Sequence, residues 1–71
     1  MEELFKRYVA VQYSGIYHMF MEAHDVMQMI DCNEKDYFYI IENYAGLKKK
    51  YPKAWEEGKE IGVEMSEQLH G

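Results

Sequence analysis

The chain of 71 residues has little of what usually reinforces a small protein, with one cysteine, one proline and one arginine. A lone cysteine, Cys32, excludes an intrachain disulfide, and no spacing of cysteine and histidine resembles a zinc site. A domain of this size buries only about 60% of the surface that its unfolded chain exposes, so its stability is marginal. Because 48% of the residues are hydrophobic, we expect surplus apolar surface to form the interface of a homo-oligomer.

The sequence also lacks a long hydrophobic run. The longest uncharged stretch covers residues 8–21 and includes Gln12 and His18, which makes it too short and too polar to span a bilayer. The chain opens with acidic residues, where a secretory signal needs cations. We therefore expect a single domain, residues 1–71, in the cytosol and without a membrane partner. Its net charge of −5 opposes non-specific binding to nucleic acid.

Motifs for catalysis and for cofactors are missing too. No nucleophile elbow, Walker pattern or dinucleotide glycine pattern is present. Cys32 follows Asp31 in a negative segment, which raises the pKa of a thiol and makes it inert. His18 and His24 are six residues apart and would face different sides of one helix, so they do not form a metal site. We expect no enzymatic activity, no cofactor and no metal.

Hydrophobic spacing predicts helices throughout. A first amphipathic run ends at Ser14-Gly15, where glycine favours the left-handed helix stop. A second run extends from Ile16 to Ile30 and closes at Asp31-Cys32. Asn33 is a good N-cap for the next helix, because acids follow it in the first turn. The sequence thus predicts an all-α domain of three or four helices.

From residue 37 onward the apolar positions keep one heptad phase. This phase passes through Pro52, which removes a helical hydrogen bond, so we expect a long C-terminal helix that is kinked or broken there. Past the proline, Gly58, Gly62 and Ser66 form a strip of small residues suited to close helix packing in a dimer or a bundle. The heptad positions are Tyr37, Ile40, Tyr44, Leu47, Tyr51, Ala54, Gly58, Ile61 and Met65.

The most unusual stretch is residues 48–55, Lys-Lys-Lys-Tyr-Pro-Lys-Ala-Trp, here called the basic-aromatic segment. It carries a charge of +4, whereas the residues before it carry −5 and those after it −4. Lysines beside aromatic rings suit a ligand with phosphates and a flat ring. The same lysines also complement the negative end of a helix dipole, and the rings also fit a core stripe. Both interpretations stay open.

If the segment binds a ligand, its lysines are the natural phosphate contacts. Lys49, Lys50 and Lys53 are the candidates, and Arg7 adds a bidentate contact if the first helix packs alongside. A base would stack on Tyr44, Tyr51 or Trp55, a contact worth about 1–3 kcal/mol. Since Tyr44 and Tyr51 also follow the heptad phase, their rings are shared with packing, and a complete pocket would need more than one subunit.

Two stretches resemble short phage and prophage proteins of unassigned function. They are Ser14-Gly15-Ile16-Tyr17-His18-Met19-Phe20, with the pattern Ser-Gly-x-x-x-Met-Phe at a helix start, and the tyrosine-bearing run from residue 37 to 44. The family usually has asparagine before Met-Phe, where this chain has His18. The resemblance covers about the first two-thirds of the chain. It implies a small helical oligomer that acts against a host defence.

Together these observations predict a non-catalytic phage-type binding protein. Its expected role is counter-defence by sequestration of a small nucleotide-derived immune signal between subunits. The alternative is an interaction module whose acidic faces inhibit a host defence protein or a nucleic-acid-binding protein.

Overall fold

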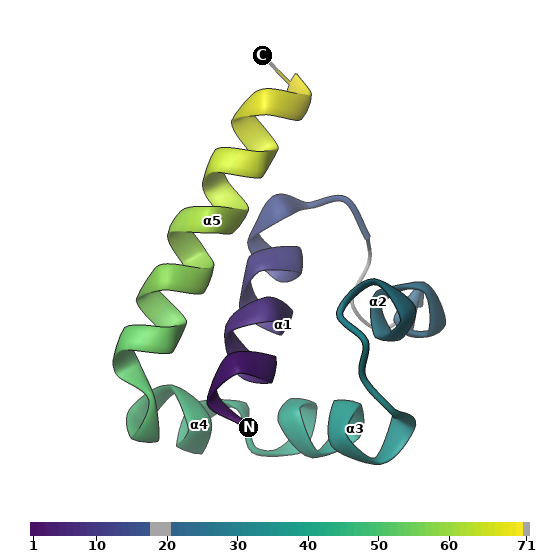
Figure 1. Ribbon diagram of the computed structural model, residues 1–71, viewed down its shortest axis with the longest axis vertical. Helices are drawn as coiled ribbons and strands as arrows, with labels where there is room; N and C mark the ends of the chain where they lie inside the picture. Colours follow the sequence, from purple (N-terminus) through teal and green to yellow (C-terminus); the bar gives the residue numbers. More distant parts are fainter. Residues whose placement is uncertain (18–20, 71) are drawn as a thin grey trace.

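The described residues, 1–17 and 21–70, form five helices and no strand in a computed structural model, with side chains described as far as residue 68 (Figure 1). This confirms the predicted all-α class and the long C-terminal helix. The predicted count of three or four helices was too low, because the chain breaks at Asn43 as well as before Pro52. The helices are α1 (Glu2–Ser14), α2 (Ala23–Met29), α3 (Glu34–Glu42), α4 (Tyr44–Lys50) and α5 (Pro52–His70).

Helix α1 ends where the sequence predicted. Gly15 adopts the left-handed conformation at φ 70°, which lacks a steric penalty only for glycine. The Ser14 hydroxyl donates to the Val11 carbonyl at 2.6 Å and accepts from the Ile16 amide at 3.3 Å, so the chain turns away from the helix axis. The expected second helix from Ile16 was therefore placed too early. The described helix begins at Ala23, and the expected helical positions 18–20 lie outside the described residues.

The turn between α2 and α3 is closed by paired hydrogen bonds. The Cys32 amide donates to the Met27 carbonyl at 2.8 Å, and the Asp31 amide donates to the Gln28 carbonyl at 3.3 Å. This is a Schellman stop with Asp31 at the left-handed position, φ 55°. The predicted N-cap of α3 is confirmed, because the Asn33 side chain accepts from the Asp36 amide at 2.8 Å.

Asn43 breaks the helical run that the heptad phase had predicted to be continuous up to the proline. Its backbone amide and its side-chain amide both donate to the Tyr39 carbonyl at 2.9 Å. The side chain thereby competes with the regular backbone pattern, as asparagine does inside helices. Helix α4 starts directly afterwards, and the Leu47 amide donates to the Asn43 carbonyl at 2.8 Å.

The predicted break at Pro52 is confirmed. The Tyr51 amide closes α4 on the Leu47 carbonyl at 2.8 Å, and Tyr51 then leaves the helical region at φ −125°, ψ 65°. A residue before proline is excluded from helical geometry by the proline ring. Pro52 occupies the first position of α5, where its missing N–H costs nothing.

Helices α1 and α5 lie side by side and run in the same direction (Figure 1). A Cβ atom on Gly58 would lie 2.6 Å from the Lys6 carbonyl oxygen, and one on Gly62 would overlap the Ala10 carbonyl oxygen and lie 2.7 Å from the Tyr13 Cβ. The predicted strip of small residues therefore serves packing within one chain.

The core lies where side chains of α1 meet those of α2, α3, α4 and α5. Its fully buried members with 0% exposure are Phe5, Val9, Val26, Tyr37 and Ile40. Since Tyr37 and Ile40 stand on the predicted heptad phase and Leu47, Ala54 and Gly58 continue it as buried residues, the phase marks the buried face as far as Gly58. It fails further along α5, where Ile61 on the phase is 41% exposed and its neighbour Gly62 is buried against α1. None of the helices formed by residues 1–17 and 21–70 is long and apolar enough to cross a membrane.

Candidate functional site

The basic-aromatic segment is split by the break at Tyr51, so its lysines point to different surroundings. The Lys48 ammonium lies 3.9 Å from the centre of the Trp55 ring, and the Lys59 ammonium lies 5.2 Å from the same ring. The Lys50 ammonium lies 5.4 Å from the Tyr51 ring. These cation–π contacts hold lysines beside the rings that the sequence had proposed as stacking platforms.

Tyr44 is a core residue rather than an open platform. Its hydroxyl donates to the Gln12 side-chain oxygen at 2.7 Å and accepts from the Trp55 indole N–H at 3.0 Å. Its ring meets Phe5 edge-on at 5.5 Å. Burial raises the pKa of Tyr44, and the hydrogen bond from Trp55 opposes this change. The rings of Tyr13 and Trp55 are also nearly perpendicular, with their centres 6.1 Å apart. Tyr44 and Trp55 therefore both already pack against other side chains.

A hollow of about 430 Å³ lies along α3 and α4, and we call it the α3–α4 groove. Its volume falls within the range of roughly 300–1,000 Å³ that small-molecule sites occupy. Of the predicted site residues it contains Lys50 and Tyr51. Its complete lining is Met1, Asp36, Tyr39, Asn43, Gly46, Leu47, Lys50 and Tyr51.

Sequence reasoning missed two polar side chains of this groove, Asp36 and Asn43. Asp36, Asn43 and Lys50 are spaced by seven residues, so they share one face of the two helices, next to the buried face that starts at Tyr37. The heptad spacing could therefore have predicted this set of residues, because a partly exposed groove forms on the helix face that lies beside the buried face. The Tyr39 ring is 49% exposed, more than any other described tyrosine.

The groove is electrically asymmetric. Asp36 stands in the first turn of α3 and Lys50 at the last residue of α4. The side-chain N–H of Asn43 is used by the Tyr39 carbonyl, which leaves the Asn43 side-chain oxygen as an acceptor. Hydrogen-bond acceptors therefore lie toward the α3 end, and an ammonium lies at the α4 end.

The other predicted cations lie elsewhere. Lys53 lines a hollow of about 230 Å³ that is otherwise rich in carboxylates, including Glu3 and Glu57. Arg7 donates to the Ile30 carbonyl at 3.3 Å and pairs with Glu3 at 3.7 Å, so it joins α1 to the end of α2. Lys49 is exposed on α4. The structure therefore gathers Lys50 and Tyr51 in the groove and Tyr44 and Trp55 in an internal cluster.

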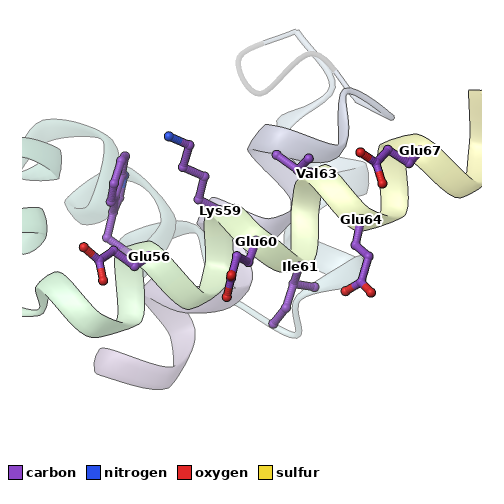
Figure 2. Close-up of a pocket in the computed structure, with 8 residues that line it drawn as sticks. Glu56, Lys59, Glu60, Ile61, Val63, Glu64 and Glu67 are labelled. Atoms are coloured by element: carbon purple, nitrogen blue, oxygen red, sulfur yellow. The ribbon is translucent and has the colours of Figure 1, made fainter.

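A larger hollow of about 770 Å³ is lined by residues of α5 alone. Figure 2 shows their side chains diverging around the helix instead of enclosing a space. This surface is the acidic face of α5. Its lining residues are Trp55, Glu56, Lys59, Glu60, Ile61, Val63, Glu64 and Glu67.

Cys32 is electrostatically unsuited to act as a nucleophile. Burial raises the pKa of its thiol, and the carboxylates of Asp36 and Asp31 raise it further. This is the direction that the sequence predicted. In the part of the chain that the structure describes, no three histidine, cysteine, aspartate or glutamate side chains converge on a point that could hold a metal ion.

The chain matches no protein-family model, no curated protein and no solved structure. Its function is therefore inferred from its own side chains. Of the two stretches that resemble phage proteins, residues 37–44 lie on α3 and the start of α4, whereas Met19 and Phe20 lie outside the described residues. The phage resemblance stays a prediction.

Proposed function

We propose that this protein is a non-catalytic, phage-type binding protein that captures a small nucleotide-derived ligand in the α3–α4 groove. One observation carries the proposal: a hollow of small-molecule size brings the Lys50 ammonium together with the rings of Tyr39 and Tyr51. A cation beside exposed aromatic faces complements phosphates joined to a base.

In this proposal Lys50 binds the phosphates and Tyr39 stacks on the base. Tyr39 replaces Tyr44 and Trp55 as the stacking ring, because those two side chains hydrogen-bond to each other inside the protein. Tyr51 is half-buried and forms part of the floor. Lys49, exposed one residue away from Lys50, attracts the anion through its charge without having to touch it.

The groove forms one wall of the proposed site, and a second copy of the chain supplies the other wall. Tyr39, which lines the groove, exposes 49% of its surface. Apolar surface at the edge of a hollow suits burial against a partner. Enclosure between two subunits would remove an immune signal from the cytosol, which is the proposed role in counter-defence.

The test measures melting temperature and binding heat with a panel of cyclic dinucleotides, linear dinucleotides and ADP-ribose derivatives. A ligand at a hundred times its Kd stabilises the folded state by about 2.7 kcal/mol. We expect one class of ligand in the panel to raise the melting temperature. Native mass spectrometry should then find this ligand bound to an oligomer of the chain.

The matched variants are Lys50→Ala in the groove and Lys35→Ala, an exposed lysine of α3 that does not line it. Lys50→Ala should weaken binding at least about tenfold, whereas Lys35→Ala should leave it unchanged. Equal effects of both substitutions, or no stabilisation by any compound in the panel, would contradict the proposal.

The acidic face of α5 favours a second candidate function, inhibition of a host protein with a basic surface. Glu56, Glu60, Glu64 and Glu67 are all exposed there (Figure 2). A single-sign face raises the association rate with a partner of opposite charge. Pull-down from nuclease-treated host lysate tests this candidate. A stoichiometric protein partner that is lost in the variant Glu60→Gln/Glu64→Gln would favour inhibition over sequestration.

A further inference from the structure

Asp36 is the one carboxylate in the lining of the α3–α4 groove, and it is half-buried there. Among the described residues, no lysine, arginine or histidine lies within ion-pair distance of it. The side chain of Asn33 binds the backbone amide of Asp36, so helix capping does not occupy the carboxylate either. A partly desolvated anion of this kind has its hydrogen-bonding capacity available to a ligand.

The two ends of the groove present opposite hydrogen-bonding groups to a ligand. Asp36 and the free side-chain oxygen of Asn43 accept hydrogen bonds, whereas Lys50 only donates. Asp36 and Lys50 are fourteen residues apart, which is at most about 21 Å along straight helices. A ligand that satisfies both ends must carry donors at one end and an anion at the other.

Among nucleotide bases, guanine fits the Asp36 end best. Its N1–H and N2–H point the same way, so one carboxylate accepts both in a bidentate pair. Adenine places a ring-nitrogen acceptor beside its amino group, and that lone pair would face the carboxylate. Hypoxanthine keeps the N1–H and lacks the amino group.

We infer that the α3–α4 groove selects a guanine nucleotide, with the base edge on Asp36, the ring on Tyr39 and the phosphates at Lys50. This inference rests on the proposed function and names the ligand class for the same site. It assigns specificity to Asp36, which the sequence did not single out.

Calorimetry with GDP, IDP and ADP tests the inference on the intact chain. Because hydrogen bonds to a charged group are the strong ones, GDP should bind at least about tenfold more tightly than IDP or ADP. In Asp36→Asn, one acceptor becomes a donor, so the preference for GDP should disappear. This variant should instead prefer XDP, whose O2 accepts from the new amide. Lys50→Ala should weaken all diphosphates by a similar factor.

The outcomes separate the two levels of the proposal. Equal affinity of the native protein for GDP, IDP and ADP would overturn guanine selection and leave a nucleotide-binding groove in place. Binding of none of them, nor of any other nucleotide in the wider panel, would overturn the proposed function and this inference together. If Asp36→Asn does not fold, which melting temperature reports, the comparison of nucleotides on the native protein still decides.

Discussion

The α1–α5 interface and the α3–α4 groove use the same residue types for opposite purposes. At the interface, Gly62 lets two backbones touch and Tyr44 hides its hydroxyl between Gln12 and Trp55. In the groove, a Cβ on Gly46 would meet nothing within 4 Å, and Tyr39 remains 49% exposed. Residue type therefore does not separate packed positions from exposed ones in this chain. What separates them is whether another helix lies opposite.

The largest expected difference in stability between the two regions comes from replacing their glycines with alanine. Gly62→Ala forces a methyl group against the Ala10 carbonyl, so we expect it to lower the free energy of unfolding by about 3 kcal/mol. Gly46→Ala has open space and better helix propensity, and it should raise stability by up to about 1 kcal/mol. Urea denaturation of both variants measures the difference. A destabilising Gly46→Ala would show that the groove is filled in solution.

The tyrosine hydroxyls give the next contrast. Tyr44→Phe leaves Gln12 and the Trp55 N–H without their partner, which should cost about 1–3 kcal/mol. Tyr39→Phe removes an exposed hydroxyl and should change stability by less than about 0.5 kcal/mol. Thermal and urea unfolding compare the two. Equal losses would mean that the Gln12, Tyr44 and Trp55 contacts do not contribute to folding.

Tyr8, which is buried in the core, makes the free energy of unfolding depend on pH in the alkaline range. Burial, followed by the neighbouring Tyr37 and Tyr44, raises the pKa of Tyr8 from 10.0 to about 12. Between these values the unfolded chain has lost a proton that the folded chain keeps, so stability falls as pH rises from 10 toward 12 and is unaffected below 10. The loss should be on the order of 2 kcal/mol.

Urea titrations between pH 8 and pH 12 follow this loss. Tyr8→Phe removes the titrating group while keeping its ring, so its profile should be flatter than that of the native chain over the same range. If the free energy of unfolding of the native chain does not change with pH above 10, or if it changes equally in Tyr8→Phe, the titration of Tyr8 does not cause the alkaline loss of stability.

The smallest expected effect is the difference in stability between alanine variants of two adjacent lysines. Lys48→Ala removes the ammonium 3.9 Å from the Trp55 ring and should cost about 0.5–1 kcal/mol at this exposed site. Lys49→Ala removes a lysine that covers no ring among the described residues, and it should be within about 0.5 kcal/mol of the native chain. Shifts in the urea midpoint and in tryptophan fluorescence distinguish them. A fluorescence change with Lys49→Ala alone would contradict the contact.

Several elements of the fold follow from local chemistry and were predictable. Gly15 stops α1, Asn33 caps α3 and Pro52 starts α5 because each has a backbone or side-chain property that few other residues share. The break at Asn43 was missed. Asparagine there follows the helical pattern in sequence, and only its backbone angles in the structure, φ −115° and ψ 22°, show that it interrupts the helix.

The candidate site was predictable only in part. Lys50 and Tyr51 stood out as a cation beside a ring, and both line the groove. Arg7 pairs with Glu3, one helical turn away. Lys53 shares a hollow with Glu57, one turn away, and with Glu3, which is distant in the chain. Asp36 was not singled out, because an acid in the first turn of a helix is ordinary by itself.

The sequence by itself determined the helical class, the stop of α1 at Gly15, the break before Pro52, and the heptad phase of the buried face as far as Gly58. These depend on backbone preferences and on spacing, which are local properties. The tertiary structure alone decided that Gly62 meets α1 within the same chain, that Tyr44 and Trp55 satisfy each other, and that Asp36, Tyr39 and Lys50 share one groove. The reason is physical: a ring or a charge is available to a ligand only if no other helix packs over it.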